Sequence, residues 1–131
     1  MRAIDTNVVI RFLIADDRRQ AAAARAVIEA GDIFIPTTVL LESEWVLRSG
    51  YDIPPSQIAE GLRALAGLPG VTVGNPAAVA HALDGIENGM DFADALHLAL
   101  SEGCTTFLTF DKKLRAATRR GASISVETPT I

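Results

Sequence analysis

Short apolar runs alternate along this chain with longer segments in which apolar residues recur at helical spacing. The short runs are typical of strands and cover residues 3–4, 33–35, 71–73, 106–108 and 124–126. The longer segments predict helices over residues 17–29, 38–49, 55–67, 76–88, 92–102 and 112–119. Glycines and prolines stand between most of these elements, where turns are expected. The alternation of strands with helices indicates an α/β fold built on a parallel sheet.

The length of the chain predicts a single domain over residues 1–131, long enough to bury a core without disulfides or structural metal. Cys104 is the sole cysteine, so no intramolecular disulfide can form, and its apolar neighbours predict a small buried side chain. The N-terminus lacks the long apolar run of a signal peptide or a membrane span. We therefore expect a soluble cytoplasmic protein with no membrane segment.

The formal charge of −4 argues against a general binder of polyanions, because phosphate contacts are made by lysine and arginine. Any contact with nucleic acid is therefore expected to be local. The basic residues that could make it form two groups: Arg11, Arg18 and Arg19, and Lys112, Lys113, Arg115, Arg119 and Arg120. Taken alone, the second group is better explained as the solvated face of a helix.

Two carboxylates directly follow predicted strands, at the edge of a parallel sheet where ligands commonly bind. Asp5 follows the first strand, and Asp111 follows the strand at residues 106–108. Helix capping explains each of them equally well, because an aspartate side chain accepts hydrogen bonds from the free backbone amides at a helix start. Neither position is diagnostic by itself.

Glu42 lies in a predicted helix beside mostly apolar neighbours three and four residues away, which are Thr38, Val39, Trp45 and Val46. They include no cation, so we expect a buried carboxylate that needs a partner. A capping box does not explain it, because the third residue after Thr38 is Leu41 rather than an acid. Glu44 differs, since Arg48 lies four residues on and offers an ordinary surface ion pair. Glu44 is expected to be structural.

Asp94 occupies a helix that is apolar on nearly every side, over residues 92–100. Leaving a carboxylate unpaired there is costly. Asp91 lies three residues earlier on the same face, so the two carboxylates repel each other unless a cation or a proton intervenes. Asp91 is equally explained as the helix cap. His97 can donate to Asp94 or contact a substrate, although a packed histidine is the more common case, and we do not assign it as a ligand.

Oxygen ligands without a cysteine–histidine cluster suit Mg²⁺ or Mn²⁺ rather than zinc. The chemistry expected of such a site is phosphodiester hydrolysis, in which the metal generates the attacking hydroxide and neutralises charge on the phosphate and the leaving oxygen. The candidates for one acidic metal site are Asp5, Glu42, Asp94 and Asp111, with Asp91 as a fifth.

Four motifs together resemble a PIN-domain ribonuclease, in particular the VapC toxins of bacterial toxin–antitoxin systems. They are Asp5-Thr6-Asn7, Glu42 within VLLESEWVLR, Asp94 within FADALHLAL, and Asp111 within TFDKKL. The likeness runs along essentially the whole chain and keeps the order and spacing of the motifs, which makes it specific although each motif is weak.

The resemblance implies a PIN-like fold with a central twisted parallel sheet of about five strands, flanked by helices. It implies an Mg²⁺- or Mn²⁺-dependent endoribonuclease that cuts single-stranded or loop RNA. Its catalytic and metal-binding core would be Asp5, Glu42 and Asp94, joined by Asp111, and by Asp91 in some members. Thr6 resembles the hydroxyl that steadies the first aspartate. The residues that we expect to contact RNA are Arg11, Lys112 and Lys113.

The resemblance also implies a homodimer and a cognate VapB-like antitoxin, whose C-terminal segment lies along a groove and obstructs the acidic site. The helix after Pro36 is apolar nearly all round, which fits a partner surface and fits a core helix equally well.

Three other functions stay open at this point. A receiver-type phosphoacceptor domain needs paired acids after its first strand, where this chain has a lone aspartate. A phosphatase with an aspartate nucleophile needs a second aspartate two residues after Asp5, where Asn7 stands. A housekeeping PIN domain in RNA processing, or a degenerate one used only for binding, shares the motifs, although the intact acids disfavour the degenerate form.

Overall fold

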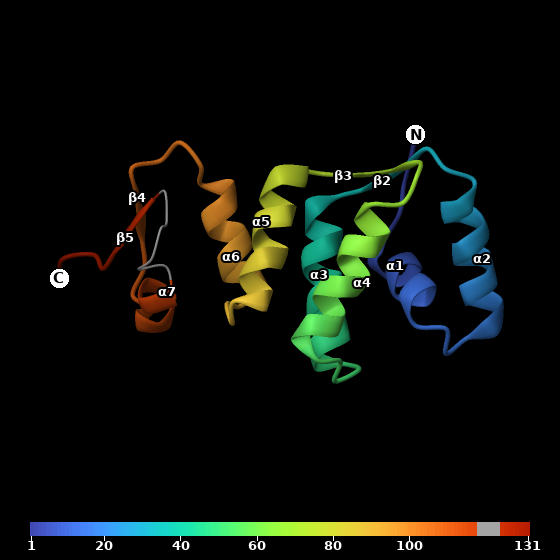
Figure 1. Cartoon of the computed structure of the whole chain (residues 1–131), viewed down its shortest axis with the longest axis horizontal. Coiled ribbons are helices and arrows are strands. Elements are labelled where there is room, and N and C mark those ends of the chain that lie inside the picture. The colour runs from blue at the N-terminus through green and yellow to red at the C-terminus, as the bar shows by residue number, and fades with distance from the viewer. Residues whose placement is uncertain (118–123) are drawn as a thin grey trace. The chain divides into compact units, whose positions relative to one another are not determined.

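The structure, a computed structural model, describes residues 1–117 and 124–131. The chain folds as two compact units, Met1–Pro76 and Ala77–Ile131, which we call the N-terminal unit and the C-terminal unit (Figure 1). Each unit contains helices and its own parallel sheet. None of the described helices is both long and apolar enough to cross a membrane.

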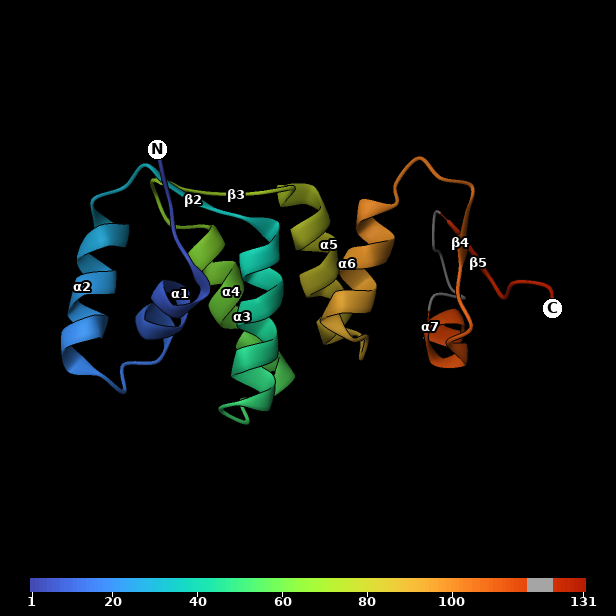
Figure 2. The same cartoon turned by 180° about the vertical axis from the view of Figure 1, so that it is seen from behind.

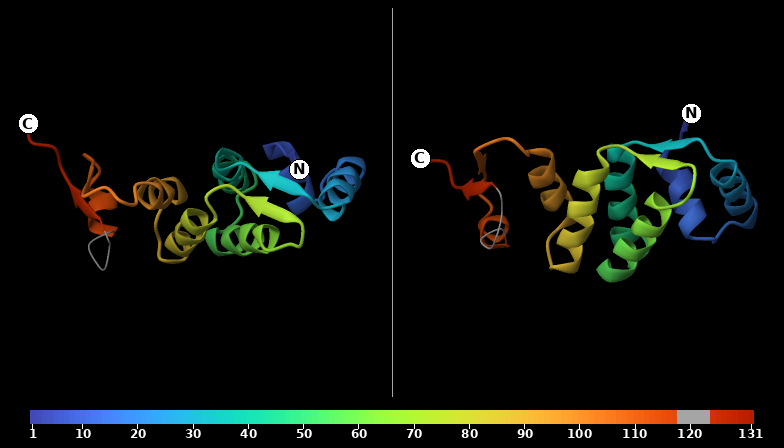
Figure 3. Two further views of the ribbon diagram at one scale, coloured as in Figure 1. Left: turned by 90° about the horizontal axis from the view of Figure 1, so that it is seen from above. Right: turned by 45° about the horizontal axis from the view of Figure 1, so that its top comes forward.

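A three-stranded parallel sheet organises the N-terminal unit. Its strands are β1 (Arg2–Ala3), β2 (Ile33–Ile35) and β3 (Val71–Val73), in the order β1-β2-β3. Arg2 is in register with Ile33, and Phe34 with Thr72. The arrows of β2 and β3 point in the same direction (Figure 3). Because all three strands are parallel, the segments that follow them, beginning at Ile4, Pro36 and Gly74, leave the sheet at one edge.

Four helices complete the N-terminal unit: α1 (Thr6–Leu13), α2 (Arg18–Glu29), α3 (Thr37–Ser49) and α4 (Pro55–Ala66). In Figure 1, α1, α3 and α4 lie on the same side of β2 and β3. Their buried residues recur three and four positions apart, as Ile58, Leu62 and Leu65 do in α4. Ile33 and Ile35 of β2 are buried as well, and these side chains form the core of the unit.

The C-terminal unit consists of α5 (Pro76–Glu87), α6 (Phe92–Leu100), β4 (Thr106–Leu108), α7 (Lys112–Ala117) and β5 (Ser125–Glu127). The strands β4 and β5 pair in parallel, with Phe107 opposite Val126, and α7 lies beside them (Figure 2). In α5, Gly85 is buried, and a Cβ atom at this position would stand 2.7 Å from the Cβ of Ala95 in α6. The two helices therefore approach each other as closely as they do because residue 85 has no side chain.

The predicted elements agree closely with the observed ones, with two differences. The helix α1 was not among the predicted helices, because its run of β-branched and aromatic residues also fits a strand. The expected central sheet of about five strands is matched only in part, because ladder hydrogen bonds divide the described strands into sheets of three and two. The predicted helix 112–119 extends beyond Ala117 into residues outside the described part of the chain.

The environment of Cys104 also differs from the prediction. The side chain was expected to be buried, but it is exposed in the segment between α6 and β4. Cys104 lies in the glycine-containing turn between these two elements, and turns commonly face solvent whatever the apolar character of their neighbours in the sequence.

Candidate active site

Asp5 and Glu42, from distant parts of the sequence, meet at Thr6 in the N-terminal unit. Asp5 is the N-cap of α1, and its Oδ1 accepts a hydrogen bond from the backbone N–H of Thr6 at 2.8 Å. The hydroxyl of Thr6 donates to Oε1 of Glu42 in α3. Thr6 is buried, with 8% of its surface exposed, so it stands as a fixed bridge between the two carboxylates.

Thr6 contacts both acids, although not in the way the resemblance implied. Its hydroxyl holds Glu42, whereas only its backbone N–H reaches Asp5. No local spacing in the sequence reveals a contact between residues 36 positions apart. The capping interpretation of Asp5 is confirmed, and it uses Oδ1 alone. A carboxylate has a second oxygen, so capping and metal binding are compatible for this residue.

The buried glutamate of α3 is Glu44 rather than Glu42. Glu44 is only 4% exposed, and it accepts hydrogen bonds from Arg48 at 2.8 Å from Nε and 3.4 Å from Nη2. Glu42 is exposed. The expectation of a buried Glu42 and a surface pair at Glu44 was therefore wrong, although Glu44 does pair with Arg48 as predicted.

The reason for this reversal is the orientation of α3. Its buried face carries Leu40, Ser43, Glu44 and Leu47, which recur at helical spacing. Glu42 precedes Glu44 by two residues and so points to the other side of the helix, since each residue turns the helix by about 100°. The case for Glu42 as a ligand consequently rests on its contact with Thr6 and on the family motif, not on burial.

Ser43, between the two glutamates, is fully buried, with 0% of its surface exposed. Within the described part of the chain its Oγ has no hydrogen-bond partner. A small side chain at this point lets neighbouring elements pack closely against α3, at the cost of a buried hydroxyl that makes no hydrogen bond.

Two other acids of the C-terminal unit, Asp91 and Asp111, act on Asp94 through their charges. Asp91 is the N-cap of α6, and its Oδ2 accepts from the backbone N–H of Asp94 at 3.2 Å. Burial raises the pKa of the half-buried Asp94 above its ordinary value of 3.8, and the negative charges of Asp91 and Asp111 raise it further. The charge of the exposed His97 acts in the opposite direction. The repulsion predicted between Asp91 and Asp94 is thus present.

Asp111 caps α7 and is exposed. Its Oδ1 accepts hydrogen bonds from the backbone N–H groups of Lys113 at 2.9 Å and Leu114 at 3.2 Å, while its own N–H donates to Thr109 Oγ1 at 3.0 Å. As for Asp5, the capping interpretation is confirmed and leaves one carboxylate oxygen outside the cap. Its negative charge contributes to the raised pKa of Asp94.

The basic residues expected to contact RNA have different surroundings. Arg11 donates from Nε to Gln20 at 2.6 Å and from Nη1 to Asp16 and the hydroxyl of Tyr51, both at 3.3 Å. The hydrogen bond to Tyr51 is the main reason that the pKa of Arg11 is raised. This network joins α1 to α2 and to the segments before α2 and after α3. The role of Arg11 toward RNA stays a prediction.

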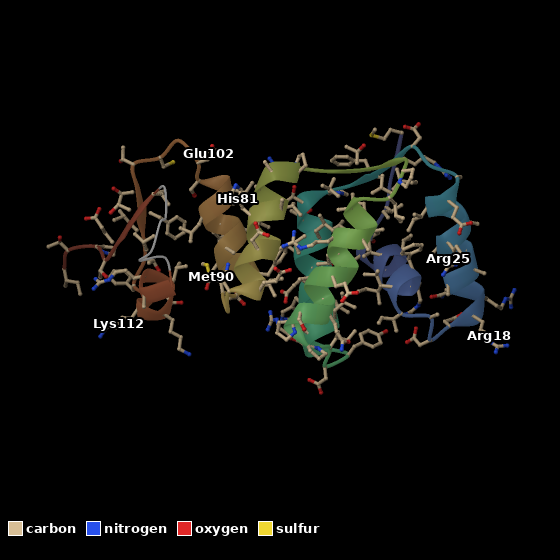
Figure 4. All side chains as sticks on the ribbon, viewed as in Figure 1. Arg18, Arg25, His81, Met90, Glu102 and Lys112 are labelled. Atoms are coloured by element: carbon tan, nitrogen blue, oxygen red, sulfur yellow. The ribbon has the colours of Figure 1, made fainter. Side chains whose placement is uncertain are left out.

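Lys112 and Lys113 are exposed on α7, where Figure 4 shows Lys112. Arg18, at the start of α2, is exposed as well (Figure 4). Arg119 and Arg120 lie outside the described residues. Contact of any of these side chains with a substrate stays a prediction.

The chemistry of the acids fits a divalent metal ion. All of the candidate ligands are carboxylate oxygens, and the repulsion that raises the pKa of Asp94 is the kind that a bound cation relieves. Within residues 1–117 and 124–131, no three or more His, Cys, Asp or Glu side chains gather as a metal-binding group. Of the candidate ligands, Asp5 and Glu42 lie in the N-terminal unit, and Asp91, Asp94 and Asp111 lie in the C-terminal unit.

Comparison with known protein families matches residues 3–120 to the family described as PIN domain. The matched region includes all four motifs and extends through both compact units. A search of curated proteins found no match to the chain.

Proposed function

Because the chain belongs to the PIN domain family, whose fold is of the nuclease type, we propose that it is a metal-dependent endoribonuclease. We propose that Asp5, Glu42, Asp94 and Asp111 hold Mg²⁺ or Mn²⁺, with Asp91 as an additional acid. A divalent ion at this site supplies an activated water and neutralises charge on the phosphate and on the leaving oxygen. The observation that carries the proposal is the bridge at Thr6, which joins the acids of the first two family motifs.

The residues of the chain have separate roles in this proposal. Thr6 orients the carboxylate of Glu42 through its hydroxyl, and its backbone N–H fixes one oxygen of Asp5. In the C-terminal unit, Asp91 anchors the first turn of α6, from which Asp94 projects. The raised pKa of Asp94 supports a role as a metal ligand, because a group that resists ionisation alone gains most from an adjacent cation.

We further propose that the chain acts as the VapC-like toxin of a toxin–antitoxin pair, in the cytoplasm, as a homodimer bound by a VapB-like antitoxin. This proposal includes one domain over residues 1–131, and the family match across both units supports it. Intact acids at all four motifs favour a nuclease over a degenerate domain used only for binding. Membership of the PIN family sets aside the receiver and phosphatase alternatives.

The decisive experiment is a cleavage assay with purified protein and single-stranded or hairpin-loop RNA, in Mg²⁺, in Mn²⁺ and in chelator. Cleavage is expected with either ion and not in chelator, and cleavage in chelator would contradict the metal mechanism. Asp5→Asn and Asp94→Asn are expected to abolish cleavage while the circular dichroism spectrum stays unchanged. The matched control is Asp52→Asn, because Asp52 is an exposed acid with φ of 54°, a conformation that asparagine accepts equally well.

The toxin role needs a separate test, because a housekeeping nuclease would also cleave RNA. Expression of the chain is expected to arrest growth, and Asp94→Asn is expected to remove the arrest. Co-expression of the neighbouring small open reading frame should restore growth and yield a complex without nuclease activity. Growth arrest that this neighbour does not relieve would favour the housekeeping alternative.

A further inference from the structure

Trp45 is the sole tryptophan of the chain, and 58% of its surface is exposed. It lies on α3 three residues after Glu42, so the two side chains project from neighbouring positions on one helix face. Leu40, Ser43 and Leu47 form the buried face of the same helix. An exposed indole offers a large flat apolar face together with an N–H donor, so this side chain is suited to contact another molecule.

The neighbourhood of Trp45 narrows the choice of that molecule. Glu42 accepts the hydroxyl hydrogen of Thr6, and the N–H of Thr6 bonds Asp5. Trp45 follows Glu42 by three residues and is therefore separated from it by less than one turn of α3, which rises about 5.4 Å per turn. A substrate whose phosphate reaches Glu42 comes within reach of the indole ring.

The charges of the N-terminal unit favour a contact that does not depend on ionic attraction. Three of its arginines already pair with carboxylates: Arg11 with Asp16 at 3.3 Å, Arg25 with Glu29 at 3.7 Å and Arg48 with Glu44 at 2.8 Å. Figure 4 shows Arg25 on α2, where it also lies 5.5 Å from the ring centroid of Phe12. With a formal charge of −4 over the whole chain, attraction of phosphates is weak. Base stacking does not depend on charge, because every base has a π face.

We propose that Trp45 is a stacking platform for an unpaired base of single-stranded RNA bound beside Asp5 and Glu42. This inference rests on the proposed function and adds to it a residue that holds the substrate without touching the reacting phosphate. Single-stranded RNA is the ligand because only an unstacked base offers its face to an aromatic side chain. A base held there positions the adjacent phosphodiester at the acids.

The test compares Trp45→Leu with Trp45→Phe, because leucine keeps the apolar character and phenylalanine also keeps an aromatic ring. Trp45→Leu is expected to raise KM for single-stranded RNA roughly tenfold or more, and Trp45→Phe only a few-fold. The kcat of both variants should stay near that of the unchanged protein, since the ring binds substrate and transition state alike. The fold-increase in KM that Trp45→Leu causes should be the same at low and at high salt. Leu100→Ala, which removes another exposed apolar side chain, serves as the control.

Fluorescence provides a readout that does not require cleavage. In the Asp94→Asn protein, emission comes from Trp45 as the only tryptophan, and addition of a short fluorescein-labelled single-stranded RNA should quench it as the RNA anisotropy rises. A rise in anisotropy without quenching would overturn the inference, as would equal KM values for Trp45→Leu and the unchanged protein. A change of oligomeric state in Trp45→Leu with an unchanged KM would also overturn it and assign the ring to a protein interface. Absence of cleavage in the unchanged protein, by contrast, would contradict the proposed function itself.

Discussion

Thr6 donates its hydroxyl hydrogen to the carboxylate of Glu42, and this bond joins two residues 36 positions apart in the sequence. A buried threonine thereby sets the direction of an exposed acid. If Glu42 is a metal ligand, Thr6 is a positioning residue, since it acts on the metal only through Glu42. Groups of this kind commonly change metal affinity or activity by about 10- to 100-fold when they are removed.

Thr6→Val keeps the shape of the side chain and removes the donor. We expect it to lower kcat about tenfold and to raise the Mg²⁺ concentration needed for half-maximal cleavage. It should lower the free energy of unfolding by about 1 kcal/mol, because the loss of one hydrogen bond is modest. Thr6→Ser, which keeps the hydroxyl, should restore the metal dependence. A normal metal dependence in Thr6→Val would show that the bond has only a structural role.

Glu42 and Glu44 form a natural pair for comparison, since they differ by two positions on one helix. Glu44→Gln should lower the free energy of unfolding by about 1–3 kcal/mol, because it weakens the charge-assisted hydrogen bonds that the buried Glu44 accepts from the exposed Arg48. Cleavage by the folded variant should be nearly unchanged. Glu42→Gln should do the opposite, abolishing cleavage with little effect on unfolding. Urea titration and a cleavage assay on both variants separate the roles, and loss of cleavage in a fully folded Glu44→Gln would reverse the assignment.

The raised pKa of Asp94 makes stability depend on pH in a definite direction. The folded state binds the proton of Asp94 more tightly than the unfolded chain does, so ionisation of this group disfavours folding. The contribution of Asp94 to the stability of the folded state is therefore favourable at low pH, and it is lost as pH rises from 3.8 through the folded-state pKa. In chelator, Asp94→Asn should be more stable than the unchanged protein at neutral pH.

The difference in the free energy of unfolding between the two proteins should shrink as pH falls and should vanish well below 3.8, where Asp94 is protonated in both the folded and the unfolded state. Denaturant unfolding at a series of pH values measures it. Added Mg²⁺ should stabilise the unchanged protein more than the variant. A stability difference that is constant with pH would contradict this explanation.

Ser43→Ala tests the cost of the unpartnered hydroxyl. We expect the variant to be more stable by about 1 kcal/mol, because it removes an unsatisfied buried group and places a better helix former in α3. Ser43→Thr adds a methyl group at a fully buried position and should be destabilising. Thermal unfolding of the unchanged protein and the two variants gives their order of stability. A Ser43→Ala variant less stable than the unchanged protein would mean that Ser43 Oγ makes a hydrogen bond in solution.

The strands and most helices of this chain follow from local patterns, because each of them depends on the spacing of apolar residues over a short window. The helix α1 did not follow, since Val8, Val9 and Ile10 favour a strand by intrinsic propensity while the contacts of α1 with α2 and α3 favour a helix. Division of the strands between two sheets depends on long-range pairing, which no local window contains.

The orientation of α3 shows a different limit. The helix face that carries Glu42 was predicted to be buried, because its apolar residues include Trp45 and large aromatic side chains are usually buried. The structure instead buries Ser43 and Glu44, the first through its small size and the second through Arg48. The acids themselves were predicted from motifs, and the predicted repulsion acts on Asp94. The bridge through Thr6 required the structure, because it depends on how α1 and α3 pack.

The close packing of α5 on α6 has a genetic consequence. Gly85 has no side chain with which to bind or catalyse, yet a methyl group there would push against Ala95, one residue from Asp94. A selection for inactive variants of this chain should therefore recover substitutions at Gly85 together with those at the carboxylates. Such alleles would retain every catalytic carboxylate and still fail, so loss of activity in such a selection does not by itself identify a catalytic residue.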